Sequence, residues 1–286
     1  MKIGAMVESF RLGFRGGVEK AASLGVAGIQ AFATDGELAP ENMTKEKIRE
    51  TLDIVKSNGI VFSALCGDFG YGFNDADQNR YYIDKSKRVL DLSLELGCGI
   101  VTTHVAHIAD EPDQKKVEIM LEACRELAEY ADSVGAYFAI ETGGDKGSVL
   151  GPFLDSLGAQ GLRVNFDPAN LVMCQDDRPE EALKYLGKYV VHTHAKDGVM
   201  LKKKVEGKIE LDEEAKKHAA MMDMGLKFME MPLGKGDVDF DIYLPALKAT
   251  GFDGFLTIER EVGDNPADDI AMAVGFLREK IAKFGL

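Results

Sequence analysis

The sequence predicts an α/β protein of the (β/α)8 (TIM) barrel class, in which residues 1–286 form a single domain. Three observations support this prediction. Short apolar, β-branched segments alternate with longer segments of helical period, which favours the α/β class. The short segments are apolar throughout, as is typical of parallel strands buried on both faces. Eight such pairs fit a (β/α)8 barrel, which usually takes about 250 residues.

A doubly wound open sheet is the alternative architecture for alternating strands and helices. Such a sheet usually carries a Gly-rich dinucleotide-binding turn directly after its first strand. Residues 8–17, which follow the first strand candidate, contain no GxGxxG pattern. The barrel is therefore the favoured fold.

Each strand candidate is followed by a segment of helical character. The strand candidates are residues 2–7, 28–33, 60–67, 99–106, 137–142, 162–167, 189–195 and 254–259. Helical periodicity runs through residues 18–25, 45–59, 86–97, 115–135, 180–187 and 267–285, and a shorter helical piece precedes residue 162. Several of these segments stop at a glycine, the residue that most often ends a helix in a left-handed conformation. These glycines are Gly25, Gly59, Gly97, Gly135, Gly187 and Gly251.

The interval between the seventh and eighth strand candidates, residues 196–253, is much longer than the others. It contains a basic run at 202–204, a helical piece from Asp212, and half of the 12 methionines. We expect an inserted loop and helix here, over the rim of the barrel. The role of residues 198–231 stays open between a lid, a subunit contact and an extra helix packed on the rim.

Composition and charge indicate the compartment and the class of partner. The first ten residues, MKIGAMVESF, lack the apolar core of a signal peptide, and no stretch approaches the roughly 18 apolar residues of a membrane-spanning helix. The four cysteines are scattered without a CxxC pair, as expected for reduced thiols. The net charge of −14 disfavours a nucleic-acid partner. We expect a cytoplasmic protein without membrane or nucleic-acid partners, and its surface is compatible with a homodimer or homotetramer.

Potential metal ligands end four consecutive strand candidates. The fifth ends in Glu141, the sixth in Asp167, the seventh in His194 and the eighth in Glu259. Active sites of (β/α)8 barrels lie at the C-terminal ends of the strands, so these side chains are expected to meet at one rim. Three clustered carboxylates repel one another unless a cation balances them. Three oxygens and one imidazole suit one divalent ion, with Mn²⁺ preferred and Mg²⁺, Co²⁺ or Zn²⁺ as alternatives.

Each of these residues also has an ordinary structural interpretation. A glutamate at a strand end is usually solvated or salt-bridged, and an aspartate before proline often caps a turn. An isolated histidine is more often a packed core residue than a ligand. The joint occurrence at the correct end of four consecutive strands is what favours the metal site.

The segment YVVHTHAKDG (189–198) places two histidines and a lysine on one face of a strand. His192, His194 and Lys196 alternate along the chain, and residues i and i+2 of a strand point the same way. His194 is then the ligand, and Lys196 lies further out, within reach of a substrate oxygen. His192 lies one layer deeper, as a packed or supporting residue.

A set of ordered motifs resembles the sugar phosphate isomerase/epimerase family. The motifs are IET (140–142), NFDPAN (165–170), VHTHAKDG (191–198), PLGKGDVDF (232–240) and LTIERE (256–261). Members of this family are xylose isomerase-like TIM barrels related to the apurinic-site (AP) endonucleases. The resemblance runs over nearly the whole chain, and the ordered set is far more specific than any one motif. It implies one divalent metal ion held by Glu141, Asp167, His194 and Glu259.

The resemblance also implies a function in carbohydrate metabolism, as an isomerase or epimerase that interconverts small ketoses or ketose phosphates. In such enzymes the metal polarises the carbonyl and stabilises a cis-enediolate. Inversion at a carbon needs a base on one face and an acid on the other. Glu141 and Glu259 are the expected catalytic pair, and His104, Asn170 and Lys196 are the expected substrate contacts.

The chain departs from the family pattern at Asn170, where many ketose epimerases carry a histidine that contacts substrate. The endonucleases have that histidine too, and they use further His and Asp ligands for three metal ions. Asp237 and Asp239 have no histidine beside them, so a trinuclear phosphodiesterase is not expected. Two alternatives stay open. One is a metal-dependent dehydratase of the inosose dehydratase type, or another β-elimination beside a ketone; the other is a non-enzymatic sugar-binding barrel.

Overall fold

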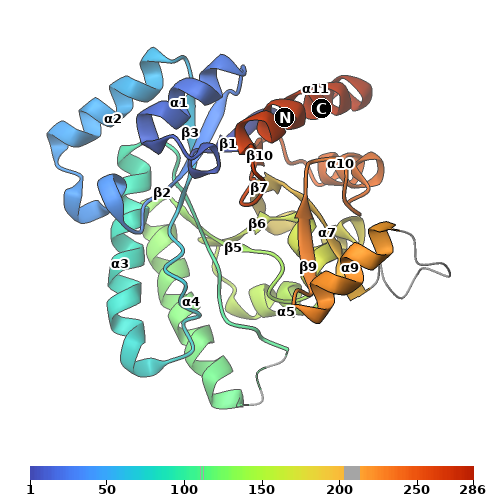
Figure 1. Cartoon of the computed structure of the whole chain (residues 1–286). Coiled ribbons are helices and arrows are strands. Elements are labelled where there is room, and N and C mark those ends of the chain that lie inside the picture. The colour runs from blue at the N-terminus through green and yellow to red at the C-terminus, as the bar shows by residue number, and fades with distance from the viewer. Residues whose placement is uncertain (110, 112, 203–212) are drawn as a thin grey trace.

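The computed structural model describes residues 1–286 except 110, 112 and 203–212. Eight parallel strands close into a barrel in the order β1-β10-β7-β6-β5-β4-β3-β2, and helices surround it (Figure 1). The barrel strands are β1 (Lys2–Met6), β2 (Gly28–Phe32), β3 (Val61–Cys66), β4 (Ile100–Thr103), β5 (Tyr137–Glu141), β6 (Leu162–Phe166), β7 (Val190–Ala195) and β10 (Phe255–Ile258). All eight strand candidates are barrel strands, and the predicted (β/α)8 fold is confirmed.

Helices connect the strands on the outside of the barrel (Figure 1). In the described part of the chain they are α1 (Gly13–Ser23), α2 (Lys45–Ser57), α3 (Ala76–Glu95), α4 (Gln114–Val134), α5 (Gly147–Leu157), α6 (Pro168–Gln175), α7 (Pro179–Leu186), α9 (Glu213–Asp223), α10 (Phe240–Ala249) and α11 (Pro266–Phe284). Short 3-10 helices lie at Glu8–Phe10, Gly36–Leu38, Pro40–Asn42 and Gly187–Tyr189. Within these described residues, no helix is both long enough and apolar enough to cross a membrane.

Helix α4 shows how local sequence sets a boundary. The Asp113 side chain accepts a hydrogen bond from the Lys115 backbone N–H and caps the start of the helix. The helix ends at Gly135, whose φ of 75° is left-handed, a conformation that glycine adopts at no steric cost. Between these ends, Met120, Cys124, Leu127 and other buried residues recur at helical spacing against the barrel.

Several helix boundaries differ from those expected from periodicity. Helix α3 starts at Ala76 rather than at 86, because its first turns are polar and carry little apolar period. Gly187 has a φ of −53° and continues into a 3-10 turn, so it is not a left-handed cap. The sequence does not predict helix α6, and for α10 it indicates only the glycine at which the helix stops, Gly251. Helix α6 begins at Pro168 with Asp167 as its cap, in an Asp-Pro pair that also favours a turn, and α10 contains Pro245.

The long interval before β10 contains more regular structure than the inserted loop and helix that the sequence predicts. Strands β8 (Asp197–Met200) and β9 (Phe228–Met231) form an antiparallel ribbon that packs against α6, and helix α9 lies between them in the chain. Helix α10 then leads back to the barrel. Lys202 is described, but the remainder of the basic run, 203–204, and the start of the helical piece at Asp212 lie outside the described residues.

One buried carboxylate organises the chain where the inserted ribbon ends. Asp197 accepts backbone N–H hydrogen bonds from Gly198, Gly234, Gly236 and Val238 at 2.8–3.1 Å. A Cβ atom on Gly236 would lie 2.1 Å from Asp197 Oδ1, so this approach requires glycine. The PLGKGDVDF segment is therefore wrapped around a single side chain that directly follows Lys196 in the sequence.

Candidate metal centre

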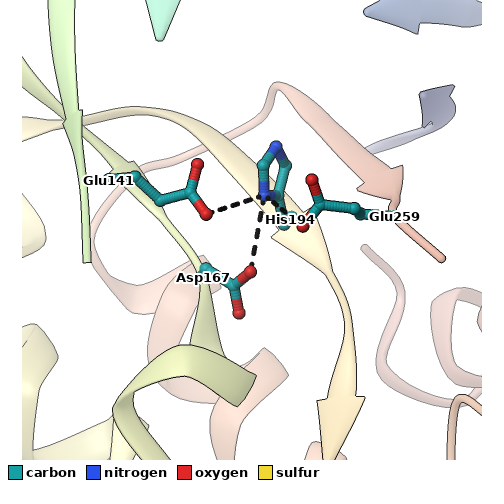
Figure 2. Close-up of side chains that lie close together, drawn as sticks. All are labelled: Glu141, Asp167, His194 and Glu259. Carbon is teal, nitrogen blue, oxygen red and sulfur yellow. Dashed lines mark ion pairs between the residues drawn. The ribbon is translucent and has the colours of Figure 1, made fainter. Parts of the chain in front are cut away.

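Four side chains converge at the C-terminal rim of the barrel, as Figure 2 shows. Glu141 is the last residue of β5, and His194 lies near the end of β7. Asp167 and Glu259 directly follow β6 and β10. Asp167 also caps α6, because its Oδ1 accepts hydrogen bonds from two backbone N–H groups of the first turn. We call Glu141, Asp167, His194 and Glu259 the metal quartet.

The quartet is arranged around Nδ1 of His194. This nitrogen lies 3.4 Å from Glu141 Oε1, 3.4 Å from Asp167 Oδ2 and 3.2 Å from Glu259 Oε2. One ligand atom from each of the four side chains lies within 4.8 Å of all the others. Each side chain is at most 10% exposed. Ligand atoms that share an ion at about 2.0–2.2 Å lie about 3 Å apart, so the spacing fits a single small cation.

Two atoms of the quartet have the character of unused ligand atoms. Asp167 Oδ2 and His194 Nδ1 are buried and have no hydrogen-bond partner, and such groups are rare because they cost free energy to bury. Burial opposes protonation of His194, but the carboxylates of Glu259 and Glu141 raise its pKa well above the usual value. In the absence of metal, the imidazolium itself supplies positive charge. Three carboxylate oxygens and an imidazole nitrogen suit a divalent ion.

Comparison with known families identifies the barrel. The family model described as xylose isomerase-like TIM barrel matches residues 18–280. The chain belongs to this family. The resemblance seen in the sequence motifs is thereby confirmed. No curated protein matches the chain.

Solved structures similar to this xylose isomerase-like barrel cover nearly all of it. A D-psicose 3-epimerase from Clostridium cellulolyticum H10, solved with D-tagatose, is 16% identical with a TM-score of 0.74, over 98% of this chain and 99% of that one. The probable 3-DHS dehydratase AsbF of Bacillus anthracis is 19% identical (TM-score 0.75; 97% and 99% coverage). A Mycobacterium smegmatis barrel solved in complex with magnesium is 17% identical (TM-score 0.71; 99% and 97%). At these identities the likeness shows a shared fold.

Behind the quartet, this xylose isomerase-like barrel carries neutral polar side chains, of which sequence reasoning singled out only His192. We call Gln30, Thr102, Asn165, His192 and Thr257 the supporting layer; all are at most 1% exposed. Gln30 Oε1 lies 3.0 Å from His194 Nε2, and Asn165 Nδ2 donates to Glu141 Oε2 at 3.0 Å. Their only signal in the sequence is a polar residue within an apolar strand. His192 lies one layer below His194, as the alternation predicts, and burial lowers its pKa well below the usual value.

Lys196 lies beside Glu259 at the rim. Its Nζ is 2.9 Å from Glu259 Oε2 and 2.5 Å from Glu261 Oε2, and the side chain is 5% exposed. Burial disfavours the ammonium, but Glu259 and its acidic neighbours raise the pKa of Lys196 well above the usual value. Lys196 and His194 in turn hold the pKa of Glu259 low despite its burial. The predicted substrate contact Lys196 is therefore already engaged with carboxylates, and Glu259 is held as a carboxylate.

His104 and Asn170 lie on the other side of the site, beside Glu141. His104 Nδ1 bonds to Asp68 Oδ2 at 2.7 Å, and its Nε2 lies 3.7 Å from Glu141 Oε1. Burial lowers the pKa of His104, but Glu141 and Asp68 together raise it to about 9. Asn170 Nδ2 donates to Glu141 Oε1 at 2.9 Å. The substrate roles of His104, Asn170 and Lys196 remain predictions.

Proposed function

We propose that this protein is a divalent-metal-dependent isomerase or epimerase of small ketoses or ketose phosphates. The observation that carries the proposal is the buried quartet, in which Asp167 Oδ2 and His194 Nδ1 have no hydrogen-bond partner. A divalent ion held there, with Mn²⁺ preferred over Mg²⁺, Co²⁺ or Zn²⁺, would polarise a ketose carbonyl and stabilise charge on the neighbouring oxygens. Membership of the xylose isomerase-like family supports the proposal.

Glu141 and Glu259 are the proposed proton-transfer pair. They approach His194 from opposite sides in Figure 2, and inversion of a carbon requires an acceptor on one face and a donor on the other. Glu259, held as a carboxylate by Lys196 at 2.9 Å, is the proposed acceptor. Glu141, which accepts hydrogen bonds from Asn165 and Asn170, is the proposed donor on the opposite face. Small sugars would then be the partners of a cytoplasmic enzyme.

Dehydration is a second candidate reaction, because of the Asp68–His104 pair. Asp68 holds Nδ1 of His104, so that Nε2 points toward Glu141 Oε1 at 3.7 Å. An imidazolium in this position can protonate a hydroxyl that leaves from the carbon β to the carbonyl. A dehydratase needs such a donor, whereas an epimerase does not. The similar structure of a probable dehydratase makes this reaction worth testing beside the first.

Metal content and product analysis test both reactions. We expect about one Mn, Mg, Co or Zn per chain by elemental mass spectrometry, and a lower content in Glu259→Gln. The loaded enzyme is then incubated with a panel of ketoses in D₂O. Deuterium beside the carbonyl in a product of unchanged constitution indicates an isomerase or epimerase, and loss of one water indicates a dehydratase. A protein that takes up none of these ions contradicts the proposal.

A further inference from the structure

Two carboxamides meet the His194 ring on the side away from the carboxylates. Gln30 Oε1 lies 3.0 Å from Nε2, and Asn165 Nδ2 lies 3.3 Å from the same atom. Gln30 and Asn165 are 0% exposed, and His194 is 1% exposed. Bulk water therefore does not compete for Nε2. These two amides determine whether Nε2 carries a proton or a free lone pair.

Asn165 faces Nε2 with its amino group. The same Nδ2 donates to Glu141 Oε2 at 3.0 Å, and a carboxylate only accepts hydrogen bonds. Its Oδ1 lies 2.9 Å from His192 Nδ1, which donates to it. Rotating the amide by 180° would set oxygen against oxygen at Glu141. Asn165 is thus fixed as a donor group and cannot accept a proton from Nε2 of His194.

Gln30 faces Nε2 with its carbonyl oxygen. Its amino group donates to Thr102 Oγ1 at 2.9 Å, which leaves Oε1 directed at the ring. Strand β2, which carries Gln30, is not a neighbour of β7 in the barrel, so this contact crosses the barrel interior. Gln30 is the only acceptor that the described residues place within hydrogen-bonding distance of Nε2.

We propose that Gln30 is a positioning residue that keeps a proton on Nε2 of His194, so that the ring gives up its Nδ1 proton and presents the Nδ1 lone pair when metal binds. The proposal rests on the metal role of the quartet. Without the Gln30 oxygen, only the Asn165 amino group faces Nε2, and it favours a lone pair there. The neutral ring would then keep its proton on Nδ1, where it points at the three carboxylates and blocks coordination. Hydrogen bonds of this kind from the second ring nitrogen generally orient metal-binding histidines.

Two substitutions of Gln30 distinguish the role of its acceptor oxygen from the role of its side-chain volume. Gln30→Met keeps the length of the side chain but has no comparable acceptor, whereas Gln30→Glu keeps an oxygen facing Nε2. Thr51→Val is the matched control, because Thr51 is a buried polar residue of helix α2 that belongs to neither the quartet nor the supporting layer. Thermal unfolding of each metal-free variant reports damage to the fold.

Metal affinity is the first readout, measured by competition with a chelator. We expect Gln30→Met to weaken binding of Mn²⁺ or Zn²⁺ by about 10- to 100-fold, and Gln30→Glu and Thr51→Val to stay within about threefold of wild type. Long-range ¹H–¹⁵N spectra of the Zn²⁺-loaded wild type should place the ring proton of His194 on Nε2. This spectrum is independent of catalysis.

Unchanged affinity in Gln30→Met overturns the proposal, and so does a ring proton on Nδ1 in the loaded wild type. If Gln30→Met does not fold, Gln30→Glu is the deciding variant. A loss of metal affinity beyond about tenfold in folded Gln30→Glu contradicts an acceptor role for residue 30. A wild type that binds no divalent ion is a different result, because it overturns the proposed metal site and the role of Gln30 with it.

Discussion

The metal quartet and the supporting layer are both buried, but they differ in how completely their polar atoms are hydrogen-bonded. The quartet holds three carboxylates and has two atoms, Asp167 Oδ2 and His194 Nδ1, without a hydrogen bond. The supporting layer is neutral, and each of its members bonds to another member or to the quartet. Burying unpaired groups is unfavourable, so the contrast indicates where a ligand belongs and which groups hold its donors in place.

The two glutamates of the quartet show a second contrast. Glu259 forms an ion pair with Lys196, whose Nζ lies 2.9 Å away. Glu141 instead accepts hydrogen bonds from the carboxamides of Asn165 and Asn170. A cation fixes charge on its partner, and an amide mainly fixes orientation. The predictions that follow test each contrast in turn.

Removing charge from the quartet should have the largest effect. Glu259→Gln keeps the shape of the side chain but removes the carboxylate that lies 3.2 Å from His194 Nδ1. We expect turnover to fall by about 10²- to 10⁴-fold, the usual contribution of a proton-transfer group, and the metal content to fall with it. Deuterium exchange into the ketose measures the first, and elemental mass spectrometry measures the second.

Glu261→Gln is the matched control for this substitution. Glu261 also contacts Lys196, but its side chain is 64% exposed and lies outside the quartet. Its loss should change turnover by less than about tenfold, as expected for a partly solvated ion pair. Equal losses in both variants would show that the quartet has no special role.

Removing Lys196 should show how much this lysine contributes to the stability of the fold. Lys196→Met removes one of the two cations that contact buried Glu259, the other being His194, and breaking a buried pair typically costs about 3–5 kcal/mol. We expect that loss of unfolding free energy in the metal-free protein, and a smaller loss with saturating Mn²⁺, because the ion also balances Glu259. Denaturant unfolding with and without metal measures both values.

An exposed lysine provides the comparison for Lys196. Lys188 pairs with Asp155 at 2.6 Å, but the two side chains are 62% and 54% exposed. Lys188→Met should leave stability close to that of the wild type, with or without metal, because a solvated ion pair contributes little. If Lys196→Met behaves in the same way, Lys196 is not part of the electrostatic balance of the site.

The eight barrel strands and the quartet follow from sequence for a simple physical reason. Parallel barrel strands are buried on both faces, so they are short apolar runs, and the residue that ends each run lies on the functional rim. Glu141, Asp167, His194 and Glu259 are therefore visible as polar residues at fixed places in a repeating pattern.

Apart from His192, the supporting layer was not predictable in this way, and neither was the inserted ribbon. All of β2 except Phe32 is buried, so a polar residue there does not reveal which partner it faces. Gln30 meets His194 across the barrel, and that contact exists only after the sheet closes. Strands β8 and β9 have four residues each, too few for a readable alternation. Helix α6 begins at an Asp-Pro pair that serves equally as a turn or as a cap with proline in the first helical position.

Proton release on metal binding tests the charge of the quartet. The carboxylates raise the pKa of His194 well above its usual value, so the metal-free ring carries a proton that coordination at Nδ1 must displace. We expect release of about one proton per ion near neutral pH, and metal affinity that rises as pH rises. Calorimetry in two buffers of different ionisation enthalpy measures the proton count. Binding without proton release would mean that Nδ1 is not a ligand.

Removing the Asn170 amide should give the smallest effect of these substitutions. It separates the orientation of Glu141 from the charge of the quartet. Asn170→Ala removes the hydrogen bond from Asn170 Nδ2 to Glu141 Oε1, 2.9 Å long, and leaves every charge of the quartet in place. A hydrogen bond to a charged group contributes about 1.5–3 kcal/mol. We take the lower value for Asn170 because its bond to Glu141 is only partly buried. We therefore expect turnover to fall by about tenfold while metal affinity changes by less than about threefold.

Gln175→Ala is the matched control on the same helix, because Gln175 bonds to the backbone oxygens of Gly143 and Gly144 rather than to the quartet. It should leave both turnover and metal affinity near wild type. A fall in metal affinity as large as the fall in turnover in Asn170→Ala would show that the amide stabilises the ligand set. A fall in turnover alone would show that Asn170 orients Glu141 for proton transfer, so that a side chain which binds the ion is positioned separately for chemistry.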